Sequence, residues 1–228
     1  MKKNLNEKYV IVPSAGIGTR FESNVPKQYI KIQGISILER TIKHFLELEI
    51  FEKIIVPIHP EDNFFEKLSI SKHKKILKVK GGKSRSESVM SALNCIEKNS
   101  IIVVHDAVRP FIDKKEIISL IENFNPSDED ILVYGIPVYE ALKKINQEDL
   151  SVKKSVDRNK FYLAQTPQIT TSHILENSLD FCLREGFHPS DESEAIERSG
   201  GKTRIISGSR KNIKITVTED ISNKAIKS

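Results

Sequence analysis

The sequence predicts an α/β fold, in which a mostly parallel sheet is flanked by helices. Short apolar runs rich in Val and Ile alternate along the chain with segments whose apolar residues have helical spacing. Glycines or charged residues follow several of these runs, as they do at the ligand-binding edge of such sheets. The 228 residues are enough for one well-buried domain, which we expect to span residues 1–228.

The apolar runs and the helical spacing place the elements in order. The run SIIVV over residues 100–104 is the most apolar and is expected at the centre of the sheet. Predicted strands cover residues 9–12, 52–58, 76–79, 100–104, 131–136, 161–166, 202–206 and 212–216. Predicted helices cover 36–48, 84–96, 113–124 and 170–184, with short helices from 190 and 218 and weak helical character over 61–70.

Three of the predicted helices begin with a capping signal. Ser84 is followed three residues later by Glu87, Asp113 precedes an apolar-periodic segment, and Asp191 is spaced from Glu194 as a cap pair. Helix N-termini favour anions. A helix that starts at Ser84, separated from Gly81-Gly82 by a single residue, therefore indicates an anion site.

Residues 138–160 interrupt the alternation of strands and helices. Two moderately apolar segments flank a polar tip at 146–149, which predicts a protruding hairpin or arm. A solvated lysine-rich excursion is the alternative. An isolated hairpin of this size is poorly stable alone, so we expect it to pack on a second subunit.

The composition limits the classes of binding partner and the location that we expect for the protein. The net charge is +5, but lysine is spread through the chain and aromatic residues are not interleaved with it, so we expect anionic small molecules and no nucleic acid. No run reaches 18 apolar residues and no signal peptide precedes residue 13, so no membrane span is expected. Cys95 and Cys182, each in a helical pattern, are predicted as buried free thiols, which suits a cytoplasmic protein.

The loop after the first strand, PSAGIGTR over residues 13–20, has the composition of a phosphate-binding loop. Gly16 and Gly18 let a ligand approach the backbone, and Arg20 and Lys27 add two cations. Phe21 stands where a dinucleotide fingerprint needs a third glycine or alanine, and the lysine of a P-loop is missing. A tight strand-to-helix turn is the alternative to a polyphosphate site.

Gly82 and Asp106 follow the third and fourth predicted strands. Because the carboxyl ends of parallel strands meet at one edge of the sheet, both should lie beside the Gly16 loop. Asp106 alone could instead be a helix cap after a strand.

Several phrases occur in order along the chain: PSAGIGTR, VPKQY, GGKSRSESV, VVHDAVRPF, VDR, TPQ, SDESEA and NIKITVTED. Together they resemble the 2-C-methyl-D-erythritol 4-phosphate cytidylyltransferase family. The resemblance implies a Rossmann-like nucleotidyltransferase domain whose arm, residues 138–160, interlocks a homodimer. It also implies cytidylyl transfer from CTP to a polyol phosphate with Mg²⁺, as part of non-mevalonate isoprenoid synthesis.

The resemblance further implies roles for individual residues. Catalysis would fall to Arg20, Lys27, Arg158 and Lys214. CTP would be held by Pro13, Ser14, Ala15, Gly16, Gly18, Thr19, Gly82, Arg85 and Ser88. The second substrate would meet Asp106, Arg109, Arg158 and Lys214, with Arg158 reaching the neighbouring subunit's site and Asp106 also a candidate metal ligand. We expect His105 to be a packed, hydrogen-bonded residue and not a general base.

Two departures from the family pattern bear on the acceptor. The chain has Glu140-Ala141 where the family commonly has Asp-Thr, and Val108 where alanine is usual. The loss of the threonine hydroxyl removes one hydrogen bond to the substrate phosphate, worth on the order of 1 kcal/mol. Ribitol 5-phosphate is therefore an alternative acceptor. A non-catalytic nucleotide-binding module is the alternative from another class of protein.

Overall fold

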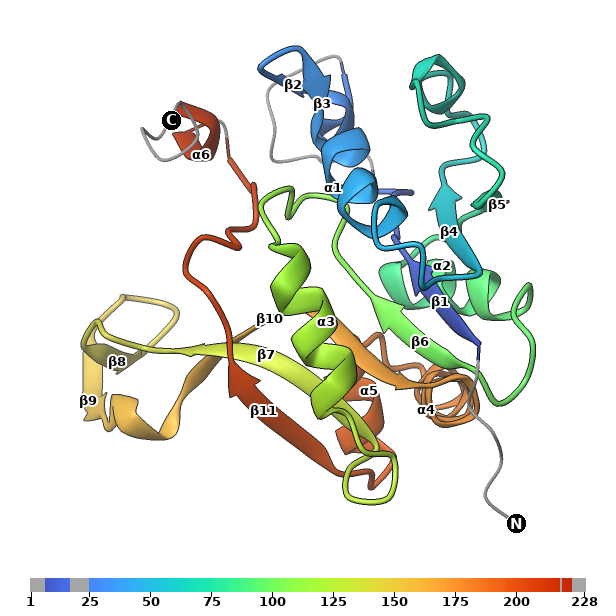
Figure 1. Ribbon diagram of the computed structural model, residues 1–228. Coiled ribbons are helices and arrows are strands. Elements are labelled where there is room, and N and C mark those ends of the chain that lie inside the picture. Colours follow the sequence, from blue (N-terminus) through green and yellow to red (C-terminus); the bar gives the residue numbers. More distant parts are fainter. Residues whose placement is uncertain (1–6, 17–24, 218, 223–228) are drawn as a thin grey trace.

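The computed structural model describes residues 7–16, 25–217 and 219–222. These residues form a seven-stranded sheet with helices on both faces (Figure 1). Its strands, in spatial order, are β11 (Thr203–Ser207), β7 (Ile131–Pro137), β10 (Tyr162–Thr171), β6 (Ile101–Val104), β1 (Lys8–Ile11), β4 (Lys53–Ile58) and β5 (Ile76–Lys80). Neighbouring strands are parallel, except that β10 is antiparallel to β6 and β7. The predicted α/β class is confirmed.

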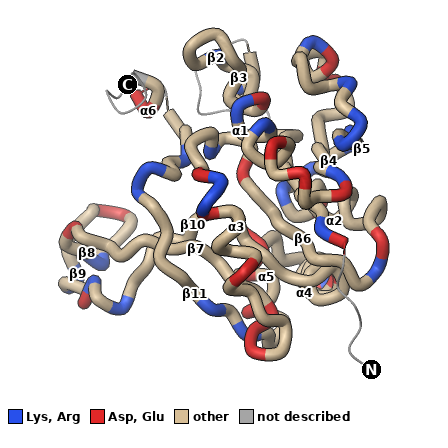
Figure 2. Tube along the Cα trace, in the orientation of Figure 1, with Lys and Arg blue, Asp and Glu red and all other residues tan. Residues whose placement is uncertain are grey.

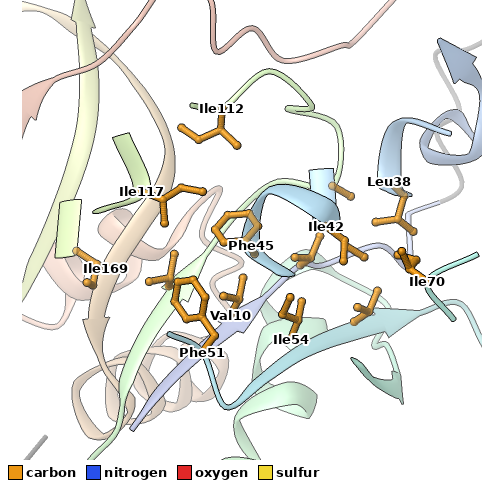
Figure 3. Close-up of a cluster of buried hydrophobic side chains, with 14 of the residues drawn as sticks. Val10, Leu38, Ile42, Phe45, Phe51, Ile54, Ile70, Ile112, Ile117 and Ile169 are labelled. Atoms are coloured by element: carbon orange, nitrogen blue, oxygen red, sulfur yellow. The ribbon is translucent and has the colours of Figure 1, made fainter. Parts of the chain in front are cut away.

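The helices bury both faces of the sheet. They are α1 (Ile37–Leu46), α2 (Arg85–Leu93), α3 (Lys114–Asn123), α4 (Ser172–Arg184), α5 (Glu192–Arg198) and the terminal α6 (Glu219–Ser222). Val10 of β1 packs with α1 and α3, around Phe45 (Figure 3), whereas the next residue, Ile11, packs with α2, α4 and α5. Burial on both faces explains why the strands are apolar runs without polar alternation.

The predicted capping signals are present. Ser84 Oγ accepts a hydrogen bond from the Glu87 N–H at 3.1 Å, and Asp191 Oδ1 accepts one from the Glu194 N–H at 2.9 Å. Asp113 caps α3 in the same way. The three caps fix the first residues of α2, α3 and α5.

The arm is a two-stranded antiparallel hairpin of β8 (Leu142–Ile145) and β9 (Val152–Val156), as the sequence predicts. It leaves the end of β7 and returns through a 3-10 turn (Arg158–Lys160) into β10, so it projects beyond the sheet (Figure 1). The antiparallel direction of β10 follows from this return.

The predicted strand at 212–216 is wrong. Two of its backbone hydrogen bonds are local, to Ser209 and Lys211, and one reaches a distant segment, from the Ile215 N–H to the Val108 carbonyl oxygen at 2.9 Å, so residues 212–216 form no strand. Asn212 and Ile215 are both buried. Ile215 packs with Val108, Ile32 and Ile37, so the apolar positions serve to anchor a crossing segment instead of pairing with the sheet.

Other local predictions need correction. Cys182 is buried, but Cys95 is exposed, because it lies just beyond the end of α2. Residues 61–70 contain a 3-10 turn (Phe65–Lys67) in place of a helix. A small hairpin of β2 (Lys31–Ile32) and β3 (Ile35–Ser36), preceded by a 3-10 turn (Lys27–Tyr29), was not predicted. None of the helices in the described segments is long and apolar enough to cross a membrane.

Candidate active site

A cavity of about 230 Å³ lies at the carboxyl edge of the sheet. It is lined by Pro13, Ser14, Ala15, Gly16, Lys27, Gln28, Gly82, Lys83, Ser84, Arg85, Ser88, Asp106, Ala107, Val108 and Lys214. The structure thus brings together the described residues predicted to bind CTP, together with Lys27, Asp106 and Lys214. The charged lining is dominated by cations, whereas Figure 2 shows basic and acidic residues interspersed along the rest of the trace.

The loop after β1 is fixed by hydrogen bonds on both sides. The Ser14 N–H donates to the Pro57 carbonyl oxygen at 2.8 Å, which extends the pairing with β4. The buried Gln28 amide donates to the carbonyl oxygens of Ser14 at 2.8 Å and Gly16 at 3.1 Å. We did not predict Gln28, although it directly follows Lys27 in VPKQY. The predicted residues Gly18, Thr19 and Arg20 lie outside the described part of the chain.

The two glycines of the loop after β5 have no room for a side chain. A Cβ atom at Gly81 would come within 2.4 Å of Ala15 Cβ, and one at Gly82 within 2.3 Å of Glu87 Cβ. Ser88 Oγ accepts from the Gly82 N–H at 3.1 Å and donates to the Ser84 carbonyl oxygen at 2.9 Å. These contacts hold the glycine loop against the N-terminus of α2, which is the part of a helix that favours phosphate.

Asp106, two residues beyond the end of β6, contacts three cations. Its Oδ1 lies 3.2 Å from Arg85 Nη2, while its Oδ2 lies 3.0 Å from Lys214 Nζ and 3.4 Å from Arg109 Nε. Burial of Asp106 opposes its ionisation, but Arg85, Lys214 and Arg109 outweigh that effect and hold the pKa of its carboxyl well below the usual range. Asp106 is therefore a fixed anion that orients Lys214 at the cavity.

Arg85 is held from the other side by Glu192, at the start of α5. Its Nη1 lies 2.5 Å from Glu192 Oε1 and its Nη2 lies 2.9 Å from Glu192 Oε2, so the pair is bidentate. Burial opposes the charge on the guanidinium, but Glu192 and Asp106 together raise the pKa of Arg85 above its ordinary value. We did not predict Glu192, whose signal in the sequence was its place in SDESEA.

His105 is fully buried and hydrogen-bonded, as expected. Its Nε2 lies 3.1 Å from the Arg109 carbonyl oxygen, which can accept but not donate, so this nitrogen carries the proton. Its Nδ1 lies 3.1 Å from Thr166 Oγ1, which accepts from the Asp106 N–H at 2.9 Å. Burial lowers the pKa of His105 to about 4, so the ring is neutral near pH 7 and anchors the loop that carries Asp106.

Two predicted acceptor-binding arginines are not in the cavity lining. Arg109 is buried behind Asp106, and its Nη1 donates to the Asn212 carbonyl oxygen at 2.8 Å. Arg158 lies at the foot of the arm, where its guanidinium donates to the Tyr139 carbonyl oxygen. Lys83, which the cavity does include, was not among the predicted residues.

Glycine loops and a cation-lined cavity at the carboxyl edge of a mostly parallel sheet define a nucleotide-binding α/β protein. Residues 9–226 match the family model for 2-C-methyl-D-erythritol 4-phosphate cytidylyltransferase. The chain belongs to this family.

Individual relatives agree with that assignment. A protein of this name from Wigglesworthia glossinidia brevipalpis is 42% identical over 218 residues, which are 96% of this chain and 94% of the relative. One from Vibrio vulnificus is 34% identical over 225 residues, or 97% and 94% of the two chains. The crystal structure of the Francisella tularensis enzyme is similar with a TM-score of 0.82 and 35% identity, covering 95% of this chain and 97% of that one.

Proposed function

We propose that this protein transfers a cytidylyl group from CTP to 2-C-methyl-D-erythritol 4-phosphate, giving 4-diphosphocytidyl-2-C-methyl-D-erythritol and pyrophosphate, within isoprenoid biosynthesis. The observation that supports this proposal most strongly is the cavity, which is lined by both glycine loops and by Lys27, Lys214 and Asp106. Such a site suits a reaction between two anions, because its cations reduce their mutual repulsion. We also propose a cytoplasmic location, which the two free cysteines suit.

The reaction needs positioning and charge stabilisation rather than a base. An oxygen of the acceptor phosphate attacks the α-phosphorus of CTP, and the bond from that phosphorus to the oxygen bridging to the β-phosphate breaks, releasing pyrophosphate. In this proposal the loops at 13–16 and 82–88 hold the triphosphate, and Lys27, with Arg20, stabilises charge on the leaving group. Lys214, tethered to Asp106, steers the acceptor phosphate.

A resident metal at Asp106 does not fit this arrangement. Both of its oxygens lie within 3.4 Å of cationic nitrogens, so a metal would have to displace one of them. The described segments also contain no cluster of three His, Cys, Asp or Glu side chains suited to a metal. We propose that Mg²⁺ is held mainly by the phosphates of CTP, whose charge it would neutralise. Calorimetry should then show Mg²⁺ binding with CTP present, and binding to the nucleotide-free protein would contradict the proposal.

A second copy of the chain is the proposed partner of the arm. Large apolar side chains are exposed on the arm and at its foot: Tyr139, Ile145, Leu150, Val152, Phe161, Tyr162 and Leu163. Exposed large apolar side chains gathered on one projecting segment are typical of an interface. In a homodimer Arg158 would reach the neighbouring cavity and grip the acceptor phosphate. Mixing Arg158→Ala and Lys214→Ala proteins should then restore activity, whereas no recovery after verified subunit exchange would contradict a shared site.

The test of the reaction is pyrophosphate release from CTP and Mg²⁺, with methylerythritol 4-phosphate and ribitol 5-phosphate in parallel. Faster release with the first acceptor is expected. Preference for ribitol 5-phosphate would mean that Glu140-Ala141, both exposed on the arm, redirect the acceptor site. CTP binding without release from either acceptor would indicate a non-catalytic module.

A further inference from the structure

The Glu192–Arg85 pair lies beside Asp106, whose two carboxylate oxygens contact three cations. Arg85 occupies Oδ1 of Asp106, which leaves Oδ2 to Lys214 at 3.0 Å and to Arg109 at 3.4 Å. Glu192 is 1% exposed and takes both terminal nitrogens of Arg85. The guanidinium is thereby held in one orientation, with its main partner on the side of α5 and a single contact to Asp106.

We infer that Glu192 is a positioning residue, which acts through Arg85 to keep Oδ2 of Asp106 available to Lys214. The inference rests on the proposed cytidylyl transfer, in which Lys214 meets the acceptor. Without the charge of Glu192, Arg85 would turn toward Asp106, where a guanidinium can pair with both carboxylate oxygens. Lys214 would then lose its tether.

Asp191, a third acid near Arg85, is not an alternative partner to Glu192. Its Oδ2 accepts from the Gln168 amide at 3.0 Å. Its Oδ1 accepts from the Ser193 hydroxyl and the Glu194 N–H, both at 2.9 Å. Because these bonds cap α5, Asp191 cannot follow Arg85 without opening the helix start.

Glu192→Gln tests the inference. Glutamine keeps the volume but removes the charge and places a donor against the guanidinium. We expect kcat with the acceptor to fall on the order of tenfold, the effect of losing one charge-assisted hydrogen bond. The KM for CTP should change less than kcat, because Gln28 and Ser88, which fix the two glycine loops, do not contact Glu192, although Arg85 also lines the cavity.

The chain supplies a matched control in Glu129→Gln. Glu129 is also buried and bidentate, with Arg204 Nε at 3.0 Å and Nη2 at 2.8 Å. It precedes β7, at the amino edge of the sheet, and does not line the cavity. This variant should keep the kinetic constants of the wild type, whatever it costs in stability.

A double-mutant cycle with Arg85→Gln separates positioning from folding. If Glu192 acts through Arg85, adding Glu192→Gln to Arg85→Gln should change no kinetic constant. The double variant removes both buried charges, so it remains measurable even if Glu192→Gln alone does not fold.

The outcomes distinguish the two proposals. A wild-type protein that releases no pyrophosphate overturns the proposed reaction. With an active wild type, three results would each overturn the positioning role: unchanged kcat in Glu192→Gln, an equal loss in Glu129→Gln, or a further loss in the double variant.

Discussion

Two cavities of similar size lie at opposite edges of the sheet, and their charges differ. The cavity at the carboxyl edge has about 230 Å³ and carries Lys27, Lys83, Arg85 and Lys214 against Asp106. The cavity at the amino edge has about 250 Å³, and its carboxylates are Glu129 and Asp130. Size therefore does not mark the functional site; the sign of the charge and the glycine loops do.

The Glu–Arg pairs beside the two cavities show the same contrast. Arg204 of β11 pairs with Glu129, just before β7, and also donates to the carbonyl oxygen of Asn123 at the end of α3, so this pair ties three elements of the fold together. Arg85 satisfies Glu192 and also contacts Asp106, so that pair is coupled to a cavity residue. The same side-chain pair is structural in one place and linked to the site in the other, because its third partner differs.

The largest expected effect is on kcat, and it should differ between lysines at the carboxyl edge and a lysine near the amino edge. Lys27→Ala and Lys214→Ala should each lower kcat by about 10²–10³, the usual cost of removing a donor that stabilises the transition state. Lys98→Ala, which removes an exposed cation near the amino edge, should leave kcat unchanged. Steady-state pyrophosphate release measures both, and near-normal turnover would remove the altered lysine from the mechanism.

The next effect concerns stability at the amino edge. Arg204→Met leaves the fully buried Glu129 carboxylate without its cation, which should cost about 3–5 kcal/mol of unfolding free energy in urea. Arg184→Met is the control, since Arg184 pairs with Asp180 on the surface and should cost less than about 1 kcal/mol. Equal losses in the two variants would show that the Glu129 pair is not structural.

A smaller effect should appear in the pH dependence of stability. The pKa of His105 is lowered to about 4 by burial, whereas the unfolded chain takes up this proton near pH 6.5. Between these values the unfolded state binds more protons than the folded state, so stability falls with falling pH. The contribution of the neutral His105 ring to the free energy of unfolding is fully present above pH 6.5 and is lost as the pH falls toward 4. It amounts to about 3 kcal/mol at most.

Urea unfolding at pH 5 and pH 7 checks this contribution. His105→Gln should reduce the stability difference between the two pH values. His173→Gln, an exposed histidine at the amino-edge cavity, should leave the difference as it is. An unchanged difference in His105→Gln would mean that His105 is protonated in the folded state.

The residues that line the cavity at the carboxyl edge could be predicted from the sequence better than the residues that hold them in place. Gly82 and Asp106 could be placed beside Gly16 because each follows a parallel strand, and that rule depends on topology alone. The sequence does not place Glu192 beside Arg85, because the two residues are 107 positions apart in the chain and only the packed structure brings them into contact. Its neighbours Asp191 and Glu194 give a local capping signal, whereas a buried ion pair leaves no local pattern.

The predicted strand at 212–216 fails for a related reason. Alternating apolar residues indicate that one side of a segment is buried, but not what covers it. Here Ile215 packs with Val108, with Ile32 of the β2–β3 hairpin and with Ile37 at the start of α1, and none of these residues belongs to the seven-stranded sheet. The same crossing segment brings Lys214 to Asp106.

Amide hydrogen exchange with and without CTP and Mg²⁺ tests the central claim most directly, because it reports on both edges at once. We expect slower exchange in residues 13–16 and 82–88 at the carboxyl edge, and no change in residues 126–130 and 171–174 at the amino edge. Protection confined to the amino edge, or no protection at either, would contradict the placement of the nucleotide site.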